Sequence, residues 1–156
     1  VQLFVVDARS LEKRAVFPGK RPVRGATWSP DGARLVWTEL QNGVPVIVVW
    51  ERASGRTVTA KMPAGTYVAE NAEVRWNGSG DAIYFALRSE AWRTRTQANF
   101  ARLVRGPITH LKSPTAEPFL PWEAQRREGN VRAVAVWHIA SQRVTTLLSE
   151  RMVSSW

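Results

Sequence analysis

The sequence lacks cysteine and has only two histidines in 156 residues. Without cysteine, neither disulfide bonds nor thiolate metal sites are available. Long hydrophobic runs are also missing. The longest run, near residues 44–50, contains Pro45 and is far shorter than the roughly 20 residues that a membrane helix needs. The sequence therefore predicts no metal site and no membrane-spanning helix.

Acidic residues are scarce, with 13 Asp and Glu against 22 Lys and Arg, which gives a formal net charge of +9. A basic surface can attract nucleic acid, acidic lipid or anionic substrates. The arginines are scattered over predicted strand ends and turns, however, and no block of about five or six like charges occurs. The charge pattern therefore does not favour nucleic acid as a partner.

What the sequence does contain is a repeated hairpin pattern. Residues 27–37 predict a strand that ends at Trp28-Ser29, a tight turn at Pro30-Asp31-Gly32 and a second strand. Residues 75–85 are a less regular copy 48 positions later, with Trp76 in the place of Trp28. A repeated hairpin in a strand-rich chain indicates a repeat architecture.

The first copy extends into a unit of four strands. The β-branched and aromatic residues that favour strands cluster at 24–29, 34–39, 46–50 and 56–60. Asn42-Gly43 separates the second and third strands, and this pair favours a type I′ hairpin turn. Four antiparallel strands in roughly 40 residues match one blade of a β-propeller.

The same pattern divides the whole chain into parts of propeller blades. The fold class is therefore expected to be all-β, a partial β-propeller of about two and a half four-stranded antiparallel blades. A closed propeller needs at least about four blades, so the chain is expected to be part of a longer protein. We predict the outer strands of one blade in residues 1–18, a full blade in 23–61, a blade in 73–150 with an insertion at 88–130, and the start of another blade in 152–156.

These residues resemble a known class of propellers. Trp28-Ser29-Pro30-Asp31-Gly32, followed by Leu35-Val36-Trp37, resembles the blade hairpin of WD-like propellers. Such blades occur in the periplasmic protein of the Tol system and in the N-terminal propellers of the prolyl oligopeptidase family. The second hairpin departs from the pattern, because its Asp81 stands two positions later than the pattern requires. Three stretches of the insertion resemble a segment of bacterial serine peptidases of the prolyl oligopeptidase family, namely Arg105-Gly106-Pro107-Ile108-Thr109, Pro118-Phe119-Leu120-Pro121-Trp122-Glu123 and Gln125-Arg126-Arg127-Glu128.

The resemblance to the prolyl oligopeptidase family implies a non-catalytic propeller segment that gates the access of peptide substrates to an α/β-hydrolase domain. That domain would be its partner and is absent from this chain. The alternative is a Tol-like periplasmic propeller that binds other proteins. A G-x-S-x-G elbow with a later Asp and His, encoded downstream of Trp156, would decide for the peptidase. The compartment, whether periplasmic, secreted or cytoplasmic, stays open.

No residue of the chain is predicted to be catalytic, and no cofactor is predicted. The G-x-S-x-G pattern of a nucleophile elbow is absent. Ser29 is expected to cap its own turn, and Gly78-Ser79-Gly80 is expected to be a turn. Metal sites and acid–base pairs need converging partners. His138 is therefore predicted to be a surface strand residue and His110 an ordinary loop residue.

The sequence assigns no substrate-binding or partner-binding residue, but it offers candidates. Glu70 and Glu73 precede a predicted strand at a blade entrance, where the resemblance implies that carboxylates can hold a substrate terminus. Solvated charges at a strand edge are the favoured interpretation of both. Asp31 is expected only to accept hydrogen bonds within its turn.

Two stretches of the insertion are further candidates. Residues 88–105 interleave basic and aromatic side chains, which suits single-stranded nucleic acid, but an extended outer edge with inward-packed aromatics is the favoured interpretation. The proline-rich loop at 114–122 is the leading candidate for contact with a partner domain, because binding often resides on long loops of a rigid scaffold. The residues concerned are Arg88, Trp92, Arg93, Arg95, Phe100, Arg102 and Arg105 in the first stretch, and Pro114, Pro118, Phe119, Pro121 and Trp122 in the second.

Overall fold

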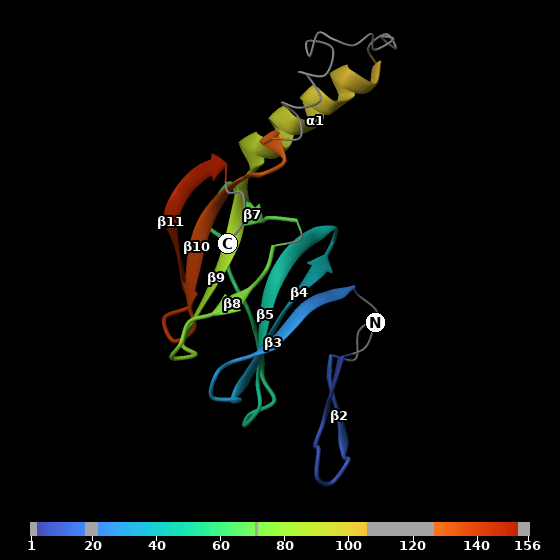
Figure 1. Ribbon diagram of the computed structural model, residues 1–156, viewed down its shortest axis with the longest axis vertical. Helices are drawn as coiled ribbons and strands as arrows, with labels where there is room; N and C mark the ends of the chain where they lie inside the picture. Colours follow the sequence, from blue (N-terminus) through green and yellow to red (C-terminus); the bar gives the residue numbers. More distant parts are fainter. Residues whose placement is uncertain (1–2, 18–21, 71, 106–126, 153–156) are drawn as a thin grey trace, which may run out of the picture.

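The computed structural model describes residues 3–17, 22–70, 72–105 and 127–152. Figure 1 shows antiparallel sheets lying side by side and a long helix that projects away from them. The all-β fold class is confirmed. The elements are β1 (Leu3–Val6), β2 (Lys13–Phe17), β3 (Val23–Trp28), β4 (Arg34–Gln41), β5 (Val44–Glu51), β6 (Thr57–Thr59), β7 (Thr66–Val68), β8 (Arg75–Trp76), β9 (Ala82–Ser89), α1 (Glu90–Arg105), β10 (Val131–His138) and β11 (Arg143–Met152).

The central sheet has the strand order β3–β4–β5–β6. Strands β4 and β5 pair along their whole length, with Leu35 opposite Trp50 and Trp37 opposite Val48. Successive side chains of a strand point to opposite faces. Both faces of this sheet are buried, which is why Leu35, Val36 and Trp37 of β4 and residues 46–50 of β5 are apolar without interruption. The four strands lie where the sequence predicts them.

The turn between β4 and β5 has the predicted type. Asn42 and Gly43 have φ angles of +51° and +78°, and positive φ at both central residues characterises a type I′ turn. Gln41 and Val44 pair directly across the turn. The prediction from the Asn-Gly pair is therefore confirmed.

The third sheet has the order β11–β10–β9–β7, and β8 also pairs with β9. Thr66 of β7 lies opposite Ser89, whereas Trp76 of β8 lies opposite Ile83. Both short strands run antiparallel to β9, so they are two pieces of one interrupted edge strand. The sequence does not predict β7, which lies between the two predicted blades at 23–61 and 73–150.

Two hydrophobic clusters lie on opposite faces of the central sheet. On the sheet-covered face, Val36 and Val49 belong to a cluster that includes Phe85 of the third sheet. On the hairpin-covered face, Trp37 and Trp50 pack in a cluster with residues of the β1–β2 hairpin. One face is thus covered by a full sheet and the other by two short strands.

The turn of the first hairpin copy is held by its own side chains, as predicted. Ser29 is 3% exposed, and its Oγ accepts the N–H of Arg34 at 2.9 Å and donates to the Asp31 carboxylate at 2.5 Å. Asp31 also accepts the N–H of Ala33 at 3.0 Å. The Ser29 hydroxyl, followed by the Ala33 N–H, holds the pKa of Asp31 below its usual value. Both side chains are therefore committed to the turn.

The second turn reaches a similar shape with other side chains. Asn77 takes the place of the serine, and its Oδ1 accepts the N–H of Ala82 at 3.1 Å. Asp81 accepts from Asn77 at 2.5 Å and from the Ser79 hydroxyl at 2.7 Å, and these bonds lower its pKa. Gly80 has a φ of +73°, close to that of the glycine in the first turn. The turn predicted at Gly78-Ser79-Gly80 is confirmed.

The first hairpins of the two sheets also contact each other. Arg34 Nη1 donates to the carbonyl of Gly80 at 3.1 Å. Trp76 Nε1 donates to the carbonyl of Thr27 at 3.2 Å. The repeated pattern therefore marks the place where neighbouring sheets are joined.

The prediction of an extended outer edge at 88–105 is wrong, because residues 90–105 form helix α1. Ser89 caps its beginning, since Ser89 Oγ accepts the N–H of Trp92 at 3.0 Å. Glu90 in the first turn and Arg102 and Arg105 in the last turn complement the helix dipole. These end signals outweigh the aromatic and basic pattern that suggested an edge.

Candidate binding site

A cavity of about 490 Å³ opens where the central sheet, the segment between β7 and β8, and α1 come together. We call it the rim cavity. Its volume lies in the range of ligand sites in proteins. Much of its wall is made of small or apolar residues from the β3 end, the β4–β5 hairpin and the segment after β7, namely Pro22, Gly25, Leu40, Pro45, Ala69 and Ala72.

Charged side chains stand among these apolar walls. The sequence singled out Glu70 and Glu73, and the structure places both on the rim cavity, with side chains that are 46% and 72% exposed. Glu73 pairs with Arg75 at 2.8 Å. Arg24 and Arg93 also line the cavity. The walls therefore combine apolar surface with charges of both signs.

Glu39 also lines the rim cavity, and sequence reasoning missed it. It is only 4% exposed, and its carboxylate accepts the indole N–H of Trp37 at 3.0 Å and the amide N–H of Gln41 at 2.7 Å. The three residues alternate along β4, so their side chains share one face. A buried carboxylate needs hydrogen-bond donors. The spacing of Trp37, Glu39 and Gln41 at every second position was a signal in the sequence that could have identified Glu39 as a buried acceptor.

Arg88 connects the rim cavity to the insertion. Its side chain is 8% exposed, and Nη1 pairs with Glu70 Oε2 at 2.5 Å. The guanidinium lies 3.8 Å from the centre of the Trp92 ring, and Nη2 donates to the carbonyl of Gly129. A buried cation requires partners of this kind. Arg88 does not line the rim cavity itself but orients Glu70, which does.

The two ends of the insertion meet beside α1. Trp92 Nε1 donates to the carbonyl of Glu128 at 3.0 Å, and Arg95 pairs with the Glu128 carboxylate at 2.5 Å. The basic and aromatic side chains near the base of α1 are therefore used for contacts within the chain. Arg102 and Arg105, further along the helix, are exposed.

Arg93 borders the rim cavity from the helix side. Its guanidinium lies 3.8 Å from the centre of the Tyr67 ring and pairs with Glu90 at 3.4 Å. Burial raises the pKa of Tyr67. A smaller hollow of about 330 Å³ continues from here along α1, and Glu70 and Arg93 line both spaces.

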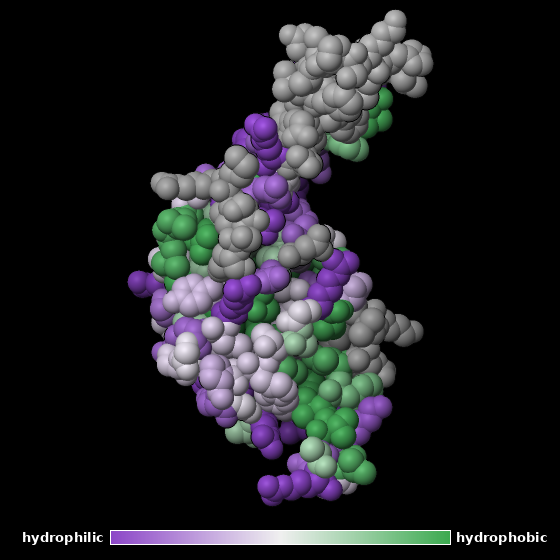
Figure 2. Space-filling model, viewed as in Figure 1, coloured by the Kyte–Doolittle hydropathy of each residue, from purple (hydrophilic) through white to green (hydrophobic). Residues whose placement is uncertain are grey.

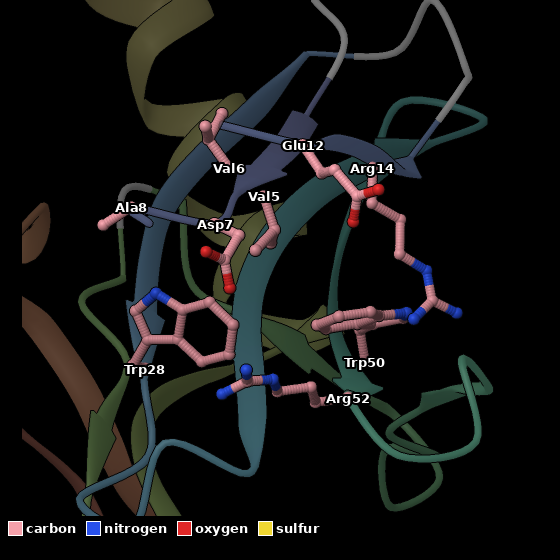
Figure 3. A pocket seen from close by; sticks show the side chains of 9 residues that line it. All are labelled: Val5, Val6, Asp7, Ala8, Glu12, Arg14, Trp28, Trp50 and Arg52. Atoms are coloured by element: carbon pink, nitrogen blue, oxygen red, sulfur yellow. The ribbon is translucent and has the colours of Figure 1, made fainter. Parts of the chain in front are cut away.

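A separate cavity of about 340 Å³ lies on the hairpin-covered face. In Figure 3, Asp7 enters it from the hairpin, and Trp28, Trp50 and Arg52 border it from the central sheet. The two indole rings are 6.2 Å apart and meet edge to face. Trp28 is 40% exposed, and Figure 2 shows hydrophobic side chains gathered beside the β1–β2 hairpin. We call this space the hairpin cavity.

The remaining predicted residues do not converge with these cavities. His138 is exposed at the end of β10, as predicted. His110 and the loop at 114–122 lie outside the described residues. Within the described ranges, no group of three or more His, Cys, Asp or Glu side chains is arranged to hold a metal ion. No helix in the described part is long and apolar enough to cross a membrane.

Comparison with known sequences gives a partial likeness to TolB proteins. No family model matches the chain. The chain is 29% identical over 70 residues to the Tol-Pal system protein TolB of Bordetella pertussis, and the TolB proteins of Bordetella parapertussis and Bordetella bronchiseptica match to the same extent. The matched region is 45% of this chain but only 15% of those proteins. The chain therefore matches a small part of its curated relatives.

Comparison with solved structures extends over almost the whole chain. TolB from Acinetobacter baumannii is similar with a TM-score of 0.51 and 10% identity, over 94% of this chain and 26% of that one. An oligogalacturonate lyase from Vibrio parahaemolyticus is similar with a TM-score of 0.56 and 10% identity, over 92% of this chain and 32% of that one. An oligogalacturonate lyase in complex with manganese has a TM-score of 0.58 and 12% identity, over 96% of this chain and 34% of that one. Identities this low carry information about the fold alone, and they agree with the sheets described above: the chain is a partial β-propeller.

Proposed function

We propose that this chain is part of a TolB-like periplasmic propeller that acts by binding other proteins. The observation that carries the proposal is the rim cavity, in which apolar walls are combined with carboxylates that are already paired with arginines. Glu70 is held by Arg88 and Glu73 by Arg75. Paired carboxylates of this kind suit recognition of a partner, whereas general acid–base catalysis needs a group poised to exchange a proton. The sequence likeness to TolB over 70 residues supports the same assignment.

A propeller that gates a prolyl-oligopeptidase-like hydrolase domain stays a prediction. Its support is the resemblance of the hairpin and of the insertion, and most of that part of the insertion lies outside the described residues. The sequence likeness to TolB over 70 residues favours the binding module instead. The two proposals predict different activities for the parent protein, namely binding of other proteins in one case and peptide hydrolysis in the other.

The test uses the parent protein, tagged and expressed in the organism from which the sequence comes. We expect it in the periplasmic fraction, and we expect it to co-purify with other proteins of a Tol–Pal system. Hydrolysis of a fluorogenic peptide by the purified parent, blocked by a serine-directed inhibitor, would overturn the proposal in favour of the peptidase. The parent gene gives the quickest check, since a G-x-S-x-G elbow downstream of Trp156 predicts the same outcome.

A further inference from the structure

We infer that the rim cavity recognises an extended segment of a partner protein in which an apolar side chain stands next to a lysine or arginine. The inference rests on the proposed function, because it names the chemistry of the partner that this binding module takes. It is carried by the apolar walls of the cavity and by the unused oxygens of two carboxylates at its edge.

The walls account for the apolar part of the ligand. Ala69 and Ala72 on one side and Pro22 and Pro45 on the other project little into the space, so about 490 Å³ stays open. Leu40 lines the same space and is 38% exposed. Burying an aliphatic side chain against such walls is favourable by the hydrophobic effect. The size of the cavity suits one or two side chains of an extended segment.

Glu70 and Glu73 account for the basic part. Arg88 engages Oε2 of Glu70, and Arg75 engages Oε2 of Glu73. The Oε1 atom of each carboxylate has no hydrogen-bond partner among the described residues. Each arginine thus orients a carboxylate and leaves one oxygen to accept from a ligand. An ammonium or guanidinium group supplies the charge-assisted donors that match it.

The arginines of the cavity do not offer the same opportunity to an acidic ligand. Arg93 already pairs with Glu90 and stacks on Tyr67. Arg24 is likewise engaged within the chain. The net charge of +9 belongs to the whole chain, and charges beyond a Debye length of about 8 Å are largely screened at physiological salt. The two Oε1 atoms, which have no hydrogen-bond partner among the described residues, are therefore the groups that select a basic ligand.

The decisive experiment is a binding screen of the labelled parent protein on an array of random ten-residue peptides. We expect the bound peptides to be enriched in adjacent apolar and basic residues. The double variant Glu70→Gln/Glu73→Gln keeps the shape of both side chains and removes their charge. Because Glu70 pairs with the buried Arg88, the urea unfolding midpoint of this variant is measured beside its peptide binding. We expect the double variant to bind these peptides about tenfold more weakly, because two partly exposed charge-assisted contacts are lost.

The matched control is Glu12→Gln, which removes a carboxylate from the hairpin cavity and should leave peptide binding unchanged. A second variant, Ala72→Leu, fills the apolar part and should also weaken binding, with an unchanged urea unfolding midpoint as evidence of folding. Enrichment of acidic peptides, or equal binding by the double variant, would overturn the inference.

The outcomes separate this inference from the proposed function. If the parent protein captures Tol–Pal proteins and the double variant captures them equally well, the binding module stands and the rim cavity is not its binding site. If basic and apolar peptides bind at the rim cavity while no Tol–Pal protein is captured, the recognition chemistry stands and the TolB-like assignment falls.

Discussion

The two faces of the central sheet are both apolar, yet they are covered in different ways. Five strands of the third sheet pack on the sheet-covered face, and Val36, Ile47 and Phe85 there are fully buried. Two short strands cover the other face, where a cavity of about 340 Å³ and a 40% exposed Trp28 remain. The difference teaches that an uninterrupted apolar run in a strand specifies two buried faces but not how tightly each face is covered.

The substitution expected to destabilise the sheet-covered face most is Phe85→Ala. Phe85 is 0% exposed and packs between two sheets that cannot both move into the space it leaves. We expect a loss of about 3–5 kcal/mol in the free energy of unfolding, measured by urea denaturation. A loss below about 1 kcal/mol would show that the two sheets are not tightly packed.

Two adjacent valines sharpen the comparison directly. Val49 lies on the sheet-covered face and Val48 on the hairpin-covered face, and they are 3% and 4% exposed. We expect Val49→Ala to lower the free energy of unfolding by about 2–3 kcal/mol and Val48→Ala by roughly 1 kcal/mol less, because the β1–β2 hairpin can shift to fill the void. Urea denaturation of both variants measures the difference. Equal losses would contradict it.

Substitutions in the turns that join the two sheets are expected to lower the free energy of unfolding by less than substitutions in the core. Ser29→Ala and Asn77→Ala each remove a side-chain acceptor from a backbone N–H at the first hairpin of one sheet. We expect each to lower the free energy of unfolding by about 1 kcal/mol. Similar values would show that serine and asparagine do the same work, whereas a loss from only one of them would mean that the two turns are not equivalent.

The smallest expected effect depends on pH. The pKa of Asp31 is lowered in the folded state, first by the Ser29 hydroxyl and then by the Ala33 N–H. A lowered pKa contributes stability above the unfolded value of 3.8, and this contribution is lost as the pH falls from there through the folded pKa. We expect Asp31→Asn to flatten the decline of the urea midpoint below about pH 4. An unchanged acid limb would contradict this.

The sequence predicted the central sheet well and the rim cavity hardly at all. The clusters of β-branched and aromatic residues and the Asn42-Gly43 turn are local signals, because residues adjacent in the sequence carry all of their information. The rim cavity draws on β3, the β4–β5 hairpin, the segment after β7 and Arg93, which only folding brings together. Glu70 and Glu73 were candidates by position, but the role of Arg88 depends on its contact with Gly129, 41 residues away.

The way the insertion leaves and rejoins the third sheet has a practical consequence for protein engineering. Leu87 on β9 pairs with Ala133 on β10, so the chain departs and returns at neighbouring points of one ladder. The cost of closing a loop between such points rises only slowly with its length. This junction is therefore a natural attachment point at which a fluorescent protein or an affinity domain can be inserted while the strands on either side keep their register.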